Sequence, residues 1–150
     1  MIHQSVSPDH ATLGDVQTLR DWHVRVNGWR DVGYNKILDR IGARPEMVLG
    51  RPLTEDGAHT RELHLNRVGI GYCVIGNFDI APPPEDSLAL LRRHVLSDML
   101  QYGIPVENVI GHGEAQAAGG VPIAERKTCP GLKFDMEAFR ASLRPGVAVG

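Results

Sequence analysis

Two stretches of the chain carry apolar residues at the three-to-four-residue spacing of an amphipathic helix, which predicts helices over residues 12–26 and 85–102. Asn27-Gly28 follows the first stretch and Gly103 follows the second, and both are typical helix stops. A third, shorter helix is predicted over residues 135–143. The apolar positions are Leu13, Val16, Leu19 and Val26 in the first stretch, and Leu88, Leu91, Val95 and Met99 in the second.

Short apolar runs bounded by turn residues predict strands between these helices. The runs cover residues 1–5, 31–39, 47–50, 68–75 and 106–111, and the fourth is the most apolar and therefore the expected central strand. Strands and helices alternate without repeats or low-complexity segments. The pattern predicts an α/β protein with a central mixed β-sheet flanked by about three α-helices.

The length of 150 residues suits one domain with its own hydrophobic core. We expect this domain to cover residues 1–143 and residues 144–150 to form a loose tail. Residues 51–67 are polar and contain His59, so they are predicted to form a surface loop that borders a site. Residues 115–125 are predicted to form a flexible insertion.

Composition excludes several classes of function. The net charge of −2 leaves no electrostatic footprint for nucleic acid and no polybasic membrane patch. The apolar runs are too short for membrane insertion, and Met1–Ser5 does not resemble a signal peptide, so we expect synthesis in the cytoplasm. Two cysteines are too few for a disulfide scaffold, and Cys73, within an apolar run, is expected to be a small core residue.

Two histidines and the second cysteine form a candidate metal site. His3 and His112 each lie where a predicted strand gives way to a loop, and Cys129 follows a lysine by two residues. Three such ligands with an open fourth position are typical of a catalytic zinc ion. The three residues are far apart in sequence, so spacing alone leaves open the commoner roles of a hydrogen-bonded histidine and a core cysteine.

Six short motifs occur in one order along most of the chain, from His3 to about Phe139. Together they resemble the zinc-dependent N-acetylmuramoyl-L-alanine amidases, a family shared by small phage endolysins and peptidoglycan recognition proteins. Each motif alone has little specificity, whereas six in the same order form a specific pattern. The motifs are His3-Gln4-Ser5, Asp31-Val32-Gly33-Tyr34, Gly57-Ala58-His59, Asn66 with Ile70-Gly71, Gly111-His112-Gly113-Glu114, and Lys127-Thr128-Cys129-Pro130-Gly131.

The resemblance implies one zinc ion per chain, held by His3, His112 and Cys129. It implies that Tyr34 and Lys127 flank the attacking water and the scissile carbonyl. The expected reaction is hydrolysis of the amide between N-acetylmuramic acid and L-alanine, in which zinc polarises the carbonyl and activates water. Lys127 would stabilise the tetrahedral oxyanion, and Tyr34 would orient the water.

The resemblance also bears on substrate contact and biological role. His59 is implied as a substrate-binding residue, with a purely structural role as the alternative. Asn66 is expected to fix its loop by bonding nearby backbone groups. Some relatives carry a catalytic glutamate where this chain has Cys73, and its absence points to the phage-type arrangement. We therefore expect a monomeric endolysin that acts on peptidoglycan of the bacterial wall, although the sequence does not give the release route.

The chain departs from the family pattern in two places. Relatives usually have a longer apolar strand before the first histidine, whereas only Met1 and Ile2 precede His3 here. Either a very short strand is pinned by the metal, or the true start lies upstream. The segment between His112 and Cys129 is long and contains Gly119-Gly120, which suggests an extra loop near the cleft.

Alternative functions remain open. A peptidoglycan-binding module without catalysis is one, although such members typically lose the cysteine ligand and Cys129 is present. A cytosolic amidase that recycles soluble muropeptides would carry the same motifs. A structural zinc domain would need a fourth protein ligand, which is not evident. A zinc deaminase is excluded because the chain has no Pro-Cys-x-x-Cys motif.

Overall fold

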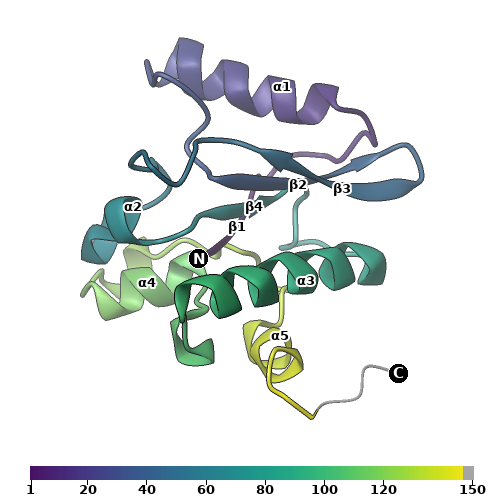
Figure 1. Cartoon of the computed structure of the whole chain (residues 1–150). Coiled ribbons are helices and arrows are strands. Elements are labelled where there is room, and N and C mark those ends of the chain that lie inside the picture. The colour runs from purple at the N-terminus through teal and green to yellow at the C-terminus, as the bar shows by residue number, and fades with distance from the viewer. Residues whose placement is uncertain (147–150) are drawn as a thin grey trace.

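The computed structural model describes residues 1–146 as one α/β domain built on a four-stranded mixed sheet, which confirms the predicted fold class (Figure 1). The strand order is β1-β4-β2-β3, with β1 and β2 parallel to β4 and β3 antiparallel to β2. The strands are β1 (Ile2–Gln4), β2 (Lys36–Ile41), β3 (Arg44–Leu49) and β4 (Tyr72–Val74), and the helices are α1 (Gly14–Asp21), α2 (Leu65–Val68), α3 (Glu85–Tyr102), α4 (His112–Ala118) and α5 (Met136–Ser142).

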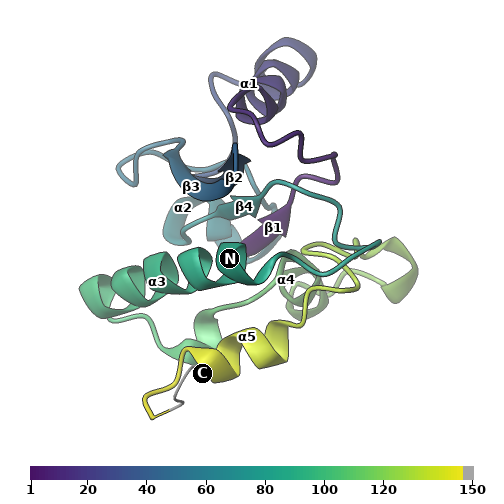
Figure 2. The same ribbon diagram turned by 90° about the vertical axis from the view of Figure 1, so that its right-hand side faces the viewer.

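The helices form layers on the two faces of the sheet. Helix α1 covers one face, and α3 covers the other with α5 packed below it (Figures 1 and 2). Two hydrophobic cores result. The smaller core lies under α1 around Ile37 and Cys73, and the larger lies between the sheet, α3 and α5 around Leu38 and Leu91. Alternate residues of β2 therefore serve opposite cores, as the two-residue period of a strand requires.

The three predicted helices are all present. Helix α1 continues into a π-helical turn, Trp22–Val26, so the helical segment ends where it was predicted to end. Helix α3 stops at Gly103, whose φ of 64° is a left-handed conformation that glycine adopts without steric cost. Helix α5 begins after Asp135, whose side chain accepts a hydrogen bond from the amide of Ala138 and so caps the helix.

Other predicted boundaries were wrong. The strand predicted over residues 68–75 is limited to β4, because residues 65–68 form α2. The strand predicted over 106–111 is a 3₁₀ turn, Val106–Asn108, followed by a single β-bridge between Ile2 and Gly111. The predicted flexible insertion over 115–125 begins inside α4, and the predicted 51–67 loop contains a 3₁₀ turn, Glu62–His64. The described residues thus hold five α-helices rather than about three.

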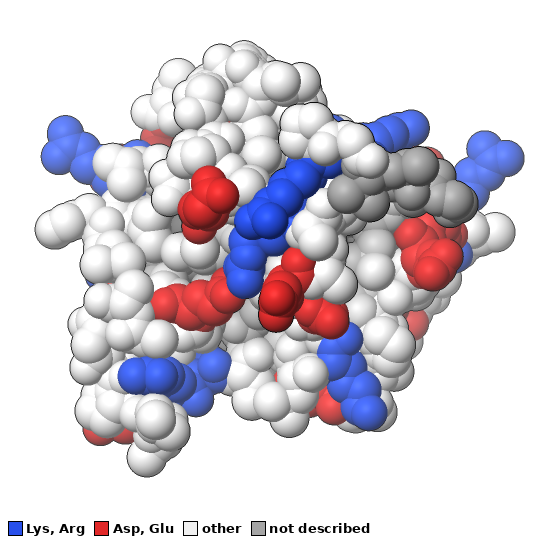
Figure 3. Space-filling model, turned by 90° about the horizontal axis from the view of Figure 1, so that it is seen from below, with Lys and Arg blue, Asp and Glu red and all other residues white. Residues whose placement is uncertain are grey.

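The predicted domain limit at residue 143 and the predicted tail from 144 to 150 stay predictions, because residues 147–150 lie outside the described residues. No helix in residues 1–146 combines the length and apolar character needed to cross a membrane. On the face shown in Figure 3, basic and acidic side chains are interspersed, in keeping with the net charge of −2.

Candidate active site

The structure brings His3, His112 and Cys129 together from three separate elements. His3 lies in β1, His112 is the first residue of α4, and Cys129 lies in the loop before α5. Their ligand atoms all lie within 4.8 Å of one another, and each residue is buried. The Cys129 Sγ is 3.6 Å from His3 Nδ1. Two imidazole nitrogens and one sulfur at this separation are close enough to bind a metal ion, and the donor set is one that zinc prefers.

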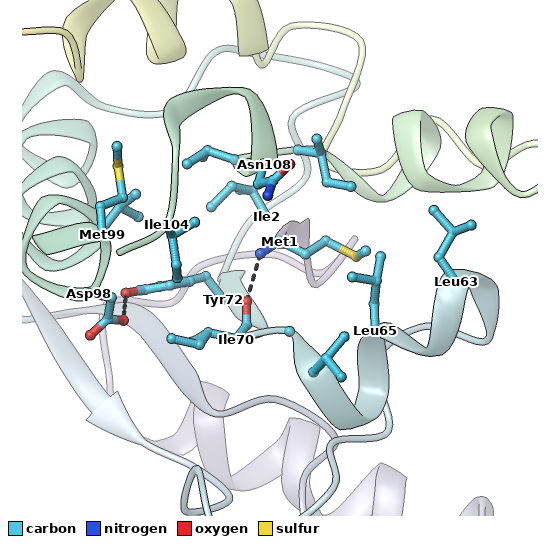
Figure 4. Close-up of a pocket in the computed structure, with 15 residues that line it drawn as sticks. Met1, Ile2, Leu63, Leu65, Ile70, Tyr72, Asp98, Met99, Ile104 and Asn108 are labelled. Atoms are coloured by element: carbon cyan, nitrogen blue, oxygen red, sulfur yellow. Dashed lines mark hydrogen bonds between the residues drawn. The ribbon is translucent and has the colours of Figure 1, made fainter. Parts of the chain in front are cut away.

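Backbone pairing supports His3 although only two residues precede it. The Ile2 amide donates to Ile110 O at 2.9 Å, and the Tyr72 amide donates to Met1 O at 2.9 Å. The amino group of Met1 donates to Ile70 O at the edge of an apolar cavity (Figure 4). His3 is 1% exposed as a result. Backbone hydrogen bonds to neighbouring segments therefore hold this short strand in place.

His59 packs against His3 on the side away from Cys129. Its Nδ1 lies 3.1 Å from His3 Nε2, so the second nitrogen of His3 is engaged while Nδ1 faces Cys129. The His59 ring fits only because two neighbours are glycines. An added Cβ would lie 2.5 Å from the ring at Gly71 and 2.6 Å from it at Gly57. This contact orients His3, as partners of metal-ligating histidines commonly do. Substrate contact by His59 stays a prediction.

Asn66 fixes the loop that carries His59, as predicted. Its side-chain oxygen accepts hydrogen bonds from the amides of His59 and Thr60 at 2.7 and 2.9 Å.

The Gly-His-Gly-Glu motif places His112 at the start of α4. The Glu114 carboxylate accepts from the Gly111 amide at 2.7 Å, which caps the helix, and it also forms a two-pronged ion pair with Arg140. The Gly113 amide donates to Cys129 O at 2.7 Å. This bond joins the segment of one ligand directly to the segment of another.

The loop with Lys127 and Cys129 is held from both sides. The Gln116 side chain of α4 accepts from the Lys127 amide at 2.7 Å, and the Thr128 hydroxyl donates to Asp79 at 2.9 Å. The Gln4 amide donates to Cys129 Sγ at 3.4 Å. Burial raises the pKa of the Cys129 thiol to about 11, whereas the Gln4 amide and the charge of Lys127 act against this rise and favour the thiolate, which is the form that binds metal.

Tyr34 and Lys127 both lie beside the three candidate ligands. The Tyr34 ring centre is 5.1 Å from that of His3. Burial raises the pKa of the Tyr34 hydroxyl well above 10, so it stays a proton donor at neutral pH. Lys127 is exposed, and its charge contributes to lowering the pKa values of both histidines after the larger effect of burial.

An open cleft of about 820 Å³ runs past this cluster. Its lining includes His112, Lys127, His59 and Trp29. The Trp29 ring also packs on His23 with ring centres 4.7 Å apart, at the end of the first helical segment. The volume falls in the range of small-ligand sites.

Glu62 is a residue of the cleft that the sequence did not single out. Its Oε2 lies 3.5 Å from His112 Nε2, and the Thr60 hydroxyl donates to the same oxygen. Burial alone would raise the pKa of this carboxyl, but the Thr60 hydrogen bond and the charge of His112 lower it below the usual value. An ionised Glu62 therefore faces one candidate ligand.

The fold and the cluster define an α/β protein with a buried His-His-Cys site on an open cleft. The family model for N-acetylmuramoyl-L-alanine amidase matches residues 1–132, and the chain belongs to this family.

Individual relatives agree with this assignment. The human N-acetylmuramoyl-L-alanine amidase is 28% identical over 138 residues, which cover 87% of this chain and 22% of the relative. The endolysin of Enterobacteria phage K11 is 29% identical over 99 residues, which cover 66% of this chain and 61% of the relative. The match thus spans about a fifth of the first relative and three fifths of the second.

A solved structure shows the same fold. The Y78F mutant of Drosophila PGRP-LB, in complex with tracheal cytotoxin, superposes with a TM-score of 0.71 at 22% identity. The match covers 91% of this chain and 76% of that chain.

Proposed function

We propose that this protein is a zinc-dependent hydrolase that cleaves the amide bond between N-acetylmuramic acid and L-alanine in peptidoglycan. The observation that carries the proposal is the convergence of His3, His112 and Cys129, of which His112 lines the cleft. Family membership supplies the substrate class.

His3, His112 and Cys129 would hold the zinc ion and leave one position open. Zinc in such a site polarises a carbonyl and makes water a nucleophile near neutral pH. The Lys127 ammonium, exposed on the cleft wall, would stabilise the negative charge that develops on the carbonyl oxygen. Tyr34 keeps its proton and would orient the attacking water by a hydrogen bond.

The cleft suits a muropeptide, and a structural neighbour was solved with tracheal cytotoxin bound. We propose peptidoglycan or its fragments as the partner of this chain, bound by a monomer, with His59 among the contacts. Similarity to a phage endolysin supports a role in lysis of the bacterial wall after synthesis in the cytoplasm. Recycling of soluble muropeptides is the alternative role for the same chemistry.

A binding module without catalysis is the second candidate function, since peptidoglycan recognition proteins share this fold. The presence of Cys129 beside both histidines favours the hydrolase. A module that only binds has no use for a complete ligand set.

The test is zinc content together with release of L-alanine amino groups from purified peptidoglycan, with and without a chelator. We expect one zinc per chain, loss of release after chelation, and recovery when zinc is restored. Zinc without release would support the binding module, and no zinc would overturn the proposed ligand set.

Variants at the two cysteines provide the matched comparison. Cys129→Ala should lose zinc and activity together, because it removes a ligand. Cys73→Ser should keep its zinc, because Cys73 is fully buried in β4 and outside the ligand cluster. Loss of zinc in Cys73→Ser with normal folding would show that the assignment is wrong.

A further inference from the structure

Three aspartates from separate elements meet on the face of the sheet that α1 covers. Asp9 lies in the connection between β1 and α1, Asp15 lies in the first turn of α1, and Asp39 lies in β2. One carboxylate oxygen from each lies within 4.8 Å of the others. None of the three lines the cleft of the candidate active site.

Asp39 is the unusual member of this trio. It is 0% exposed, and neither of its carboxylate oxygens has a hydrogen-bond partner. A buried carboxylate without a partner is costly, so such groups in folded proteins are normally neutralised or bind a cation. Burial, followed by the charges of Asp15 and Asp9, raises the pKa of Asp39 to about 6. The backbone amides of Arg40 and Val16 act to lower this pKa, but neither amide forms a hydrogen bond of normal geometry with a carboxylate oxygen of Asp39.

The side chains nearby leave Asp39 without a positive partner. His10 pairs with Asp15, through its ring Nδ1 and its backbone amide, both at 2.6 Å. The Arg40 guanidinium points to Asp86, at 2.6 Å. At neutral pH the trio therefore concentrates negative charge around a buried acceptor.

We propose that Asp9, Asp15 and Asp39 form a binding site for a hard divalent cation, of which calcium is the best fit. Carboxylate oxygens are the ligands such cations prefer, and calcium accepts irregular geometry more readily than magnesium. Asp39 supplies the buried ligand, and exposed Asp9 leaves the outer side open to water, which would complete the coordination shell.

A cation here would join three parts of the fold. It would tie the connection after β1, the start of α1 and the middle of β2 to one another, so its expected effect is on stability. The His10 side chain is 66% exposed, so its ring can move away from Asp15 at little cost and leave the Asp15 carboxylate to the cation. The site is independent of the proposed hydrolase function, because it shares no residue with the His-His-Cys cluster.

The test uses the full chain loaded with zinc, so that the cluster of His3, His112 and Cys129 is not available to the added ion. Calcium chloride is titrated by calorimetry, and thermal unfolding is recorded with calcium, magnesium or sodium chloride at matched ionic strength. We expect a dissociation constant of about 10⁻⁴–10⁻³ M and a Tm rise of several degrees at saturating calcium, with a smaller rise for magnesium.

Two variants and one control make the result specific. Asp39→Asn should abolish the calcium-dependent rise in Tm. Asp9→Asn changes only an exposed ligand and should weaken calcium binding about tenfold, which keeps the test valid if Asp39→Asn fails to fold. Glu125→Gln removes an exposed carboxylate elsewhere and should bind calcium like the parent chain.

The proposal is overturned if calcium gives no heat and no more stabilisation than sodium. It is also overturned if Asp9→Asn binds calcium with unchanged affinity. If the parent chain shows no response to calcium and Asp39→Asn is more stable than the parent chain, the proposal also fails. Asp39 is then held as a neutral, protonated carboxyl.

Discussion

At the scale of single residues, the catalytic role that we propose for Lys127 can be tested separately from metal binding. Its side chain lines the cleft, but only its backbone amide holds the loop, through Gln116. Lys127→Ala should therefore keep zinc and fold while losing roughly 10²–10³ in turnover, the usual effect of removing one group that stabilises an oxyanion. Zinc content and the rate of amine release from peptidoglycan measure both effects.

Lys133→Ala is the control for that variant, because Lys133 is also exposed but lies outside the cleft. It should keep both zinc and rate. Equal activity of Lys127→Ala and Lys133→Ala would remove Lys127 from the mechanism.

The candidate metal ligands could be proposed from the sequence, because histidine and cysteine are residue types that bind zinc and because their motifs occur in the family's order. Glu62 could not, because its contact with His112 arises only when residues 50 positions apart fold together. The contact of His59 with His3 was equally hidden, and in the structure it depends on Gly57 and Gly71, which leave room for the His59 ring.

At the scale of elements, the 3₁₀ turn with Glu62 packs against α4, whose first residue is His112. Donation from His112 Nε2 to Glu62 would leave Nδ1 as the nitrogen for a metal. Glu62→Gln removes the charge and should weaken zinc binding about tenfold without loss of fold, as is usual when a partner of a ligating histidine is changed. Competition with a chromogenic chelator measures the affinity.

Glu125→Gln provides the comparison, since Glu125 is an exposed carboxylate without a role in the cluster. If Glu62→Gln and Glu125→Gln bind zinc with equal affinity, Glu62 does not position His112.

Long elements were predictable because their apolar spacing reflects one buried face, as in α3. Short ones were not. Residues 106–111 are apolar enough for a strand, yet Val109 is buried in the larger core and Val106 packs against it. Pairing with the sheet is limited to the bridge between Ile2 and Gly111 and the hydrogen bond from the Ile2 amide to Ile110 O. Residues 115–125 look flexible from their small residues and Gly119-Gly120, but the Glu114 cap makes residues 115–118 part of α4. Tertiary contacts decided both cases.

At the scale of the whole molecule, the layer of α3 is joined to the sheet by a buried polar cluster as well as by apolar packing. Lys36 of β2 donates to both oxygens of Asp98 in α3, at 2.8 and 2.7 Å, and the Tyr72 hydroxyl of β4 donates to the same carboxylate (Figure 4). The side chains of Lys36 and Asp98 are only 15% and 7% exposed. Three elements therefore meet at one buried carboxylate.

Asp98→Asn should destabilise the domain by roughly 3–5 kcal/mol, because it leaves the buried Lys36 ammonium without its charged partner. The same two elements offer a control, since Arg40 of β2 also pairs with Asp86 of α3, but Asp86 is 51% exposed. Asp86→Asn should change stability little, because water screens an exposed pair. Urea unfolding of both variants measures the difference. Similar midpoints would mean that apolar packing alone holds α3 on the sheet.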